Sequence, residues 1–519
     1  MRIHKLIFFI AYCTILFSCT SVKKLNYIVS EKKHTPTELK ADVDYAYNLL
    51  TKGHPGVYWY IKKEQLAFKF DSLKASLVTP LTTKELYLKL APLVAEINCG
   101  HTRLILVTKK LTKYEKDSLE KLGKPIQQMN YKVIDDKLYI TTLNKKIKLA
   151  KKGDEILAIN NIPAREILNN ISKNYASDGY NKTFKTAVLN RAFPSWYTAI
   201  YENSDTLAYQ LKQRDSVFNL TLTTIKKEEK KDSLLVKKAA VKISKDSLLA
   251  KKKSALEQKR LRYKGSDENK KPILDFRFLE KDSSVAYLKV KSFSFPYANF
   301  NRFYKESFIL LKKGKTKNLI LDLRDNGGGS LAACRDLFAY LVDKDFTYLK
   351  AAEINNKFNP YWQGKGFGNA VSGLAYEITT SRLLERGSNG EHQVKFKGTK
   401  PLKAHENHYD GKLYVLINGY SFSASSLLSA NLKQIKRATF VGQETGGGFN
   451  GCVAGRIPVL SLPSSKLKLR MGMFPVIPNA YTETVGRGVF PDQEIETTID
   501  DVIKGKDKEL DWVLQKIKN

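Results

Sequence analysis

Hydrophobic residues recur with two different periods in the last part of the chain, from about residue 273 to 519. Val285–Val290 alternates between apolar and other positions, residues 299–313 have helical periodicity, and 318–323 is an almost continuous apolar run. A continuous run of this length is typical of a strand buried on both faces. Further buried strands are expected at 413–417 and 438–441. Strands that alternate with helices predict an α/β domain over residues 273–519.

Residues 35 to about 98 have a helical pattern instead. Thr35 and Glu38, and again Thr82 and Glu85, have the spacing of a capping box, in which each residue satisfies a backbone N–H of the other. Each pair precedes a segment with apolar residues at helical intervals. We therefore predict a helical N-terminal domain, with boundaries at residues 19–115.

Short alternating segments follow between about 128 and 222. Within them, Gly153 to Asn160 resembles the turn and strand of a PDZ domain, in which a Gly-Asp turn leads into a strand that ends in Asn. A glycine turn before any buried strand would look similar, and no Gly-Φ-Gly carboxylate-binding loop precedes it. A structural PDZ-like module at 116–225 is favoured over a functional receptor for peptide termini.

A strongly basic segment separates this module from the α/β domain. Residues 226–271 contain 17 Lys or Arg and 7 Asp or Glu, and the sequence KDSLL at 231–235 recurs 14 residues later. Two heptads of spacing favour a long exposed helix or helical hairpin over 226–272. Contact with an anionic lipid or polymer surface is one interpretation, and a solvated insertion is favoured over it. Single-stranded nucleic acid is disfavoured because aromatic residues are almost absent.

The first residues have the pattern of an export signal. Arg2 and Lys5 precede a run of 12 mostly apolar residues, which is too short to cross a membrane. The run ends at Ser18 and Cys19, which resembles a bacterial lipobox, so 1–18 is expected to be a signal peptide and Cys19 the lipidated residue. We expect an extracytoplasmic lipoprotein of the bacterial cell envelope, on the periplasmic or outer-membrane face. The net charge of +36 over 519 residues therefore does not indicate a nucleic-acid partner.

Cysteine and histidine spacing gives no sign of a metal site. Cys99, Cys334 and Cys452 are far apart in the sequence and form no CxxC pair, so neither a disulfide framework nor a thiolate zinc site is expected. His405 and His408 lie three residues apart in a polar segment without the HExxH spacing of a metalloprotease helix. A surface loop is the favoured interpretation of that segment.

Three motifs combine glycine, hydroxyl and imidazole groups at the ends of predicted elements. In Leu321–Gly329 (LDLRDNGGG) a buried strand leads into three glycines, whose backbone N–H groups suit an oxyanion. In 413–427 a buried strand leads into the serines of the sequence SFSASS, at the expected start of a helix. The third motif is NCGHT at 98–102, which follows the helical domain.

These motifs, together with RATFVGQETGGG at 437–448 and GRGVFPD at 486–492, resemble peptidase family S41, the tail-specific or carboxy-terminal processing proteases. They occur in the order that the family has, over roughly residues 35–500. The resemblance implies a crotonase-like (ClpP/crotonase) α/β core with helical and PDZ-like additions. It also implies a serine endopeptidase that hydrolyses polypeptides and needs no cofactor.

Carried over by position, the resemblance makes Ser423 the nucleophile. The oxyanion would be bound by the backbone N–H of Ala424 and that of Gly327 or Gly328. Nucleophile and oxyanion donors would then lie together where two strands end.

The resemblance leaves the orienting acid open. One branch of the family uses a Lys at the position of Gly448, so a Ser-Lys dyad is not expected here. The other branch, which includes the tricorn core, uses a His with a late Glu, and His101 and Glu483 fit those positions. Gly100 stands where that branch has a Ser, and the spacing to Glu483 is slightly long. Glu483 is therefore expected to act through another group such as Thr102, or His101 to work as a simpler dyad, with Glu444 as a further alternative. An inactive S41-like binding lipoprotein is the rival interpretation.

Overall fold

The computed structural model describes residues 21–227, 262–267, 270–294, 298–354, 358–364, 367–386 and 392–519. The predicted signal peptide, Cys19 and most of the basic segment lie outside these residues. Within the part that is described, no helix has the length and apolar character needed to cross a membrane.

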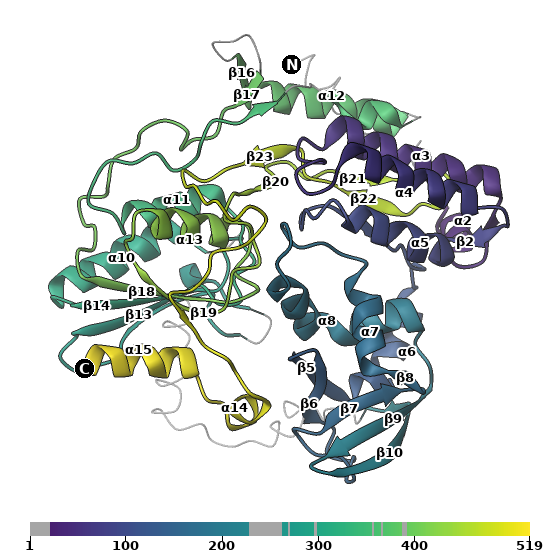
Figure 1. Cartoon of the computed structure of the whole chain (residues 1–519), viewed down its shortest axis with the longest axis horizontal. Coiled ribbons are helices and arrows are strands. Elements are labelled where there is room, and N and C mark those ends of the chain that lie inside the picture. The colour runs from purple at the N-terminus through teal and green to yellow at the C-terminus, as the bar shows by residue number, and fades with distance from the viewer. Residues whose placement is uncertain are drawn as a thin grey trace, which may run out of the picture.

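A six-stranded sheet forms the centre of the C-terminal half (Figure 1). Its strands have the order β12-β13-β14-β18-β19-β24, and every pair is parallel except the edge pair of β12 and β13. The bounds are β12 (Leu274–Phe278), β13 (Val285–Val290), β14 (Asn318–Asp322), β18 (Lys412–Ile417), β19 (Thr439–Gly442) and β24 (Gln493–Glu494). The parallel strands end at one common edge, where the loops that follow β14 and β18 meet.

Helices cover both faces of this sheet. One face packs against α10 (Phe300–Lys313), α11 (Leu331–Ala339) and α13 (Ala424–Gln434), and the other packs against α15 (Lys508–Lys518) (Figure 1). Alternate strand residues go to opposite cores: Leu319 and Leu321 face the first layer and Ile320 faces α15. The α/β prediction is therefore confirmed, and the crotonase-like assignment stays a prediction.

The N-terminal helices are α2 (Val22–Ser30), α3 (Pro36–Gly53), α4 (Lys63–Ser76) and α5 (Thr83–Ala95). Both predicted capping boxes are present, with Thr35 and Glu38 at the start of α3 and Thr82 and Glu85 at the start of α5. Apolar residues of these helices share a core with the late strands β21 (Val459–Ser461) and β22 (Lys468–Arg470). A three-stranded sheet of β21, β22 and β3 (Arg103–Ile105) thus ties the segment after α5 to the end of the chain.

The region of the expected PDZ-like module is an antiparallel sheet with the order β10-β9-β7-β6-β5, to which β8 is added. Its strands are β5 (Met129–Ile134), β6 (Lys137–Leu143), β7 (Glu155–Ile159), β8 (Ile162–Pro163), β9 (Thr206–Gln213) and β10 (Ser216–Thr223). Helices α7 (Ala164–Ser172) and α8 (Thr183–Tyr201) pack on it and complete a separate apolar core. The alternating pattern of the sequence is confirmed, and the PDZ assignment stays a prediction.

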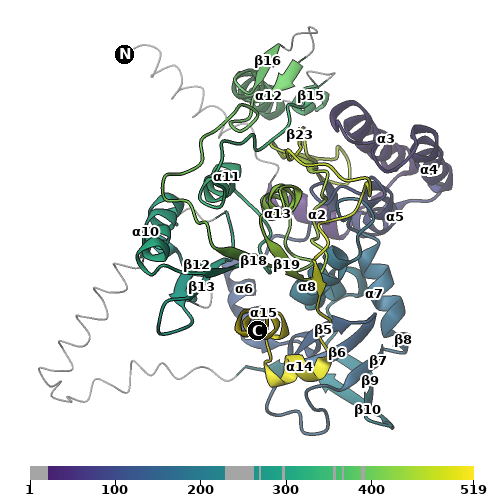
Figure 2. The same ribbon diagram turned by 60° about the vertical axis from the view of Figure 1, so that its left-hand side comes forward.

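A small unit lies at the opposite end of the molecule from this sheet (Figures 1 and 2). It consists of α12 (Phe367–Ser381) and the sheet of β15 (Glu353–Ile354), β17 (His392–Val394) and β16 (Leu384–Arg386). Its side chains join the core of the N-terminal helices through Ile354, Tyr376 and Val394.

Candidate active site

Ser423 stands at the junction between the loop after β18 and the first turn of α13. Its backbone has φ +56° and ψ −122°, a conformation that is uncommon for a residue with a side chain, and its hydroxyl caps no helix N–H. Hydrogen bonds to the loop after β14 fix this loop. The Ser421 hydroxyl donates to the Leu323 carbonyl at 2.8 Å. The backbone N–H of Phe422 also donates to the Asn326 carbonyl, at 3.0 Å. The Ser423 hydroxyl is therefore held at the sheet edge and left available.

His101 comes from the segment between α5 and β3, in the N-terminal part of the chain. Its Nε2 lies 3.0 Å from Ser423 Oγ, which is hydrogen-bond distance. The imidazole stacks on Phe422, with ring centroids 4.8 Å apart, and Arg470 donates to the His101 carbonyl at 2.7 Å. The structure thus brings together the two residues that the sequence motifs singled out as nucleophile and base.

The carboxylate beside His101 belongs to Asp178, which the sequence analysis did not single out. Its Oδ1 lies 3.9 Å from His101 Nδ1 and accepts a hydrogen bond from the Gly100 N–H at 2.8 Å. His101 Nδ1 and Asp178 Oδ2 are both buried, and neither has a hydrogen-bond partner among the described residues. Asp178 lies in the loop between α7 and α8, in a Ser-Asp-Gly turn that looks like any other turn in the sequence.

Among the described residues, neither of the two glutamates proposed from the sequence has a hydrogen bond or ion pair with His101. Glu483 is exposed, and in the described part of the chain no hydrogen bond or ion pair joins it to His101. Glu444 is buried and accepts two hydrogen bonds from the Arg487 guanidinium, at 3.0 and 2.7 Å, and one from the Gly488 N–H. The role of Glu483 therefore stays a prediction, and in this structure Asp178 is the carboxylate beside His101 Nδ1.

The glycine loop after β14 lies directly against Ser423. A Cβ on Gly328, which has φ +93°, would come within 2.7 Å of both the Phe422 carbonyl and Ser423 Cβ. The Gly328 N–H already donates to Asn326 Oδ1 at 2.9 Å, whereas Ala424, the first residue of α13, has no intrahelical acceptor for its N–H. Of the expected oxyanion donors, Ala424 and Gly327 therefore fit better than Gly328, whose lack of a side chain makes room for Ser423.

Position 448, where the Ser-Lys branch has its lysine, lies next to the same cluster. A Cβ built on Gly448 would be 3.6 Å from Asp178 Cβ. The space that a lysine would enter in that branch is thus close to the carboxylate that faces His101.

Burial and close neighbours shift the ionisation of this cluster. Burial alone would lower the pKa of His101, but Cys452, Asp178 and Cys99 outweigh it and raise that pKa well above its usual value. Burial would raise the pKa of the Cys99 thiol, but His54 and His101 lower it to about 6. Burial raises the pKa of Cys452. Two buried thiols thus adjoin the imidazole, one of them with enhanced acidity.

A cleft of about 850 Å³ opens over these groups. It is lined by His101, Ser423, Gly327 and Gly328, and also by Cys452. Arg191 and Tyr420 form part of its wall, with the guanidinium 4.3 Å from the tyrosine ring centroid. An extended segment of another molecule could reach Ser423 through this opening.

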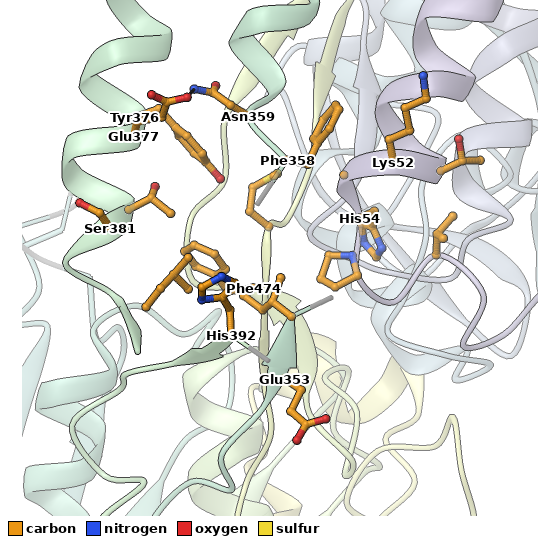
Figure 3. Close-up of a pocket in the computed structure, with 18 of the residues that line it drawn as sticks. Lys52, His54, Glu353, Phe358, Asn359, Tyr376, Glu377, Ser381, His392 and Phe474 are labelled. Atoms are coloured by element: carbon orange, nitrogen blue, oxygen red, sulfur yellow. Dashed lines mark hydrogen bonds between the residues drawn. The ribbon is translucent and has the colours of Figure 1, made fainter. Parts of the chain in front are cut away.

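A second cavity, of about 640 Å³, lies between the end of α3 and the α12 unit (Figure 3). The aromatic side chains of Phe358, Tyr376 and Phe474 line it, and His54 stands at its wall. His54 is also one of the groups that lower the pKa of Cys99, so only a short distance separates this cavity from the His101 cluster.

A serine at a helix start, a buried histidine and a carboxylate form the arrangement that serine hydrolases use. Residues 284–495 match the model of peptidase family S41. The resemblance to this family is thus confirmed over residues 284–495.

One curated protein and several solved structures are similar to this chain. A tail-specific protease of Haemophilus influenzae is 27% identical over 169 residues, which are 32% of this chain and 17% of that protein. Among solved structures, mature CPAF has a TM-score of 0.58 at 15% identity, covering 92% of this chain and 96% of its own. The structure of mature CPAF complexed with lactacystin has the same TM-score, and the match covers 93% of this chain and 98% of that one. At this identity the likeness to CPAF concerns the fold alone.

Proposed function

We propose that this protein is a serine endopeptidase that hydrolyses polypeptides through an acyl-enzyme on Ser423. The observation that carries the proposal is the 3.0 Å contact between His101 Nε2 and Ser423 Oγ at the mouth of the cleft. The S41 domain match and the name of the tail-specific protease relative support a peptidase over other serine hydrolases.

His101 acts as base and then as acid in this mechanism. Its Nε2 takes the Ser423 proton while Oγ attacks the peptide carbonyl, and the proton then passes to the leaving amine. Water attacks the acyl-enzyme in the second half, again with His101 as base. Asp178 stabilises the imidazolium from the Nδ1 side, where its carboxylate is 3.9 Å away. A small rotation of the ring shortens this contact to a hydrogen bond.

The N–H groups of Ala424 and Gly327 bind the oxyanion. Ala424 contributes the free first N–H of α13, where the helix dipole also favours negative charge. The glycine loop after β14 brings the second donor to the opposite side of Ser423. Loss of one such donor typically costs a hundredfold to a thousandfold in rate, about 3–4 kcal/mol.

We also propose that the protein works outside the cytoplasm and is anchored by lipid at Cys19. The apolar run after Arg2 and Lys5 and the lipobox-like residues that end at Cys19 support this location. Metabolic labelling with a palmitate analogue tests it, because wild type should be labelled and Cys19→Ser should not. Equal labelling of the two proteins would exclude this anchor.

The test of the activity compares Ser423→Ala with Ser425→Ala. Both serines lie at the start of α13, but Ser425 Oγ is buried and has no hydrogen-bond partner among the described residues, so its loss should be tolerated. An unfolded polypeptide is the substrate, and a serine-reactive phosphonate is the active-site label. Ser423→Ala should lose both turnover and labelling, by roughly 10⁴-fold or more in rate, and Ser425→Ala should keep both.

An inactive S41-like binding protein is the second candidate. Gly448 stands where one family branch has its catalytic Lys, and Gly100 stands where the other branch has a relay Ser. The same experiment separates the two functions. An inactive protein would be neither labelled nor able to cleave, and Ser423→Ala would then behave as wild type.

A further inference from the structure

Three buried side chains of different chemistry meet beside the catalytic imidazole. Ligand atoms of Cys99, His101 and Asp178 all lie within 4.8 Å of one another. The three residues are 5%, 5% and 2% exposed, so each is more than nine-tenths buried. They come from two separate parts of the chain, which is why their spacing gave no metal-site pattern.

Two atoms of this group are unsatisfied. His101 Nδ1 and Asp178 Oδ2 are buried and have no hydrogen-bond partner within the described residues. A buried polar atom without a partner costs about 1–3 kcal/mol, more if it is charged, so each such atom calls for an explanation, and a bound ion is one of them. When the imidazole carries its proton on Nε2, the Nδ1 atom has a free lone pair, and together with the nearby carboxylate and thiol it can bind a cation.

We propose that Cys99 Sγ, His101 Nδ1 and Asp178 form an inhibitory site for Zn²⁺. Sulfur, nitrogen and oxygen ligands together suit this borderline-soft ion better than Mg²⁺ or Ca²⁺, which prefer oxygen alone. Bond lengths of about 2.0–2.3 Å place tetrahedral ligands roughly 3.3–3.8 Å apart. The observed limit of 4.8 Å therefore requires only small side-chain movements.

The proposed site lies behind His101, which lines the cleft over Ser423. Cys452 adjoins His101 and, like His101, lines the cleft over Ser423. An ion can thus enter through the cleft rather than through the core. Cys99 currently donates its thiol hydrogen to the Val453 carbonyl at 3.6 Å, and it releases this proton to solvent when it binds the metal.

Metal binding and catalysis exclude each other at His101. A neutral imidazole whose Nδ1 lone pair binds a metal carries its proton on Nε2. Nε2 then donates to Ser423 Oγ and cannot accept the Ser423 proton. The inhibition rests on the proposed peptidase function, whereas the binding of zinc does not.

The binding test uses the reduced full-length chain and does not depend on turnover. Zn²⁺ is titrated by calorimetry, and Co²⁺ is added as a spectroscopic probe, since cobalt–thiolate bonds give a near-ultraviolet charge-transfer band. Wild type, Ser423→Ala and Cys334→Ser should bind one ion with this band, because Cys334 is a buried thiol in a different core. Cys99→Ser should bind at least tenfold more weakly and lose the band.

Two binding results would overturn the proposal. One is the absence of a thiolate band in wild type, which does not depend on the folding of any variant. The other is equal affinity of wild type and folded Cys99→Ser for Zn²⁺.

Turnover is measured separately. Zinc should inhibit turnover by wild type, and a chelator should restore that turnover. Cys99→Ser should need at least tenfold more zinc for the same inhibition. Undiminished turnover of zinc-saturated wild type would refute the inhibition. If neither protein turns over substrate without zinc, the peptidase proposal fails, and the binding result still decides the metal site.

Discussion

His101 Nε2 and Ser423 Oγ lie 3.0 Å apart although 322 positions separate the two residues in the sequence. The contact joins the segment after the N-terminal helices to the start of α13 in the central α/β domain. Catalytic competence in this protein therefore depends on how its N-terminal part packs on the α/β domain. Asp178 approaches the imidazole from the region of the antiparallel sheet, so three parts of the chain contribute to one cluster.

Asp178→Asn should lower kcat by about 10²–10⁴-fold, because the neutral amide no longer stabilises the imidazolium and favours the wrong tautomer. KM should change little, since Asp178 does not line the cleft. The rate of phosphonate labelling should fall in parallel with kcat, and an unchanged thermal midpoint would separate this effect from misfolding.

Glu483→Gln is the matched control for that substitution. Glu483 is exposed, and within the described residues no hydrogen bond or ion pair joins it to His101, so kcat should stay within about twofold of wild type, as for other surface changes. A large loss of kcat in Glu483→Gln, together with a wild-type kcat in Asp178→Asn, would instead support Glu483 as the orienting acid.

Gly328→Ala should nearly abolish activity. The added methyl group would lie within 2.7 Å of the Phe422 carbonyl and Ser423 Cβ, and the backbone has φ +93°, which alanine adopts at a cost of about 1 kcal/mol or more. The nucleophile must move, and displacement by about 1 Å can cost a hundredfold in rate. Steady-state turnover and the thermal midpoint measure the two effects.

Gly368→Ala is the matched glycine control for Gly328→Ala. Gly368 lies in α12 with nothing within 4 Å of its Cβ position, so alanine should stabilise the helix by up to about 1 kcal/mol. Turnover should be unchanged. Equal losses of activity in the two variants would contradict a specific role for the space beside Gly328.

The sequence was sufficient for elements whose pattern is local. The alternation at 285–290, the apolar run that begins at 318 and the helical spacing from 299 correspond to β13, β14 and α10, because strand and helix burial follows a fixed period. Ser423 and His101 could be predicted from the sequence because each lies in a motif with a recognisable chemistry.

Asp178 could not be found in this way. Its position depends on the packing of a loop against Gly100, 78 residues away, and nothing in the turn around it differs from an ordinary surface turn. The same reason explains why the Cys99, His101 and Asp178 cluster escaped notice. Glu483 as the orienting acid stays a prediction, because a late position in the motif order does not fix where an exposed side chain points.

Glu444→Ala should destabilise the protein without a specific catalytic effect. The substitution leaves the buried Gly488 N–H without its acceptor and the Arg487 guanidinium without its partner, at a cost of about 1–3 kcal/mol. Urea unfolding should show this loss, and kcat of the folded enzyme should remain within a few-fold. A hundredfold lower kcat at unchanged stability would instead make Glu444 the orienting acid.

Asp322→Asn should reduce stability most strongly near neutral pH. Asp322 is fully buried and accepts hydrogen bonds from Tyr287 at 2.5 Å, Lys289 at 2.9 Å and Arg324 at 2.9 Å. Burial opposes its ionisation, but Arg324, Lys289 and Tyr287 outweigh burial and hold its pKa well below the usual value. Removal of one partner from such a buried pair costs about 3–5 kcal/mol.

The sign of the pH dependence follows from this lowered pKa. The unfolded chain binds a proton at Asp322 at higher pH than the folded chain does, so the stabilisation is present above about pH 4 and is lost as the pH falls. Urea unfolding from pH 7 to pH 2 should therefore show the difference between wild type and Asp322→Asn shrinking toward acid. Asp500→Asn, at an exposed surface pair, should change stability by less than about 0.5 kcal/mol throughout. A difference between wild type and Asp322→Asn that stays constant down to pH 2 would mean that the Asp322 carboxylate is not ionised in the folded protein.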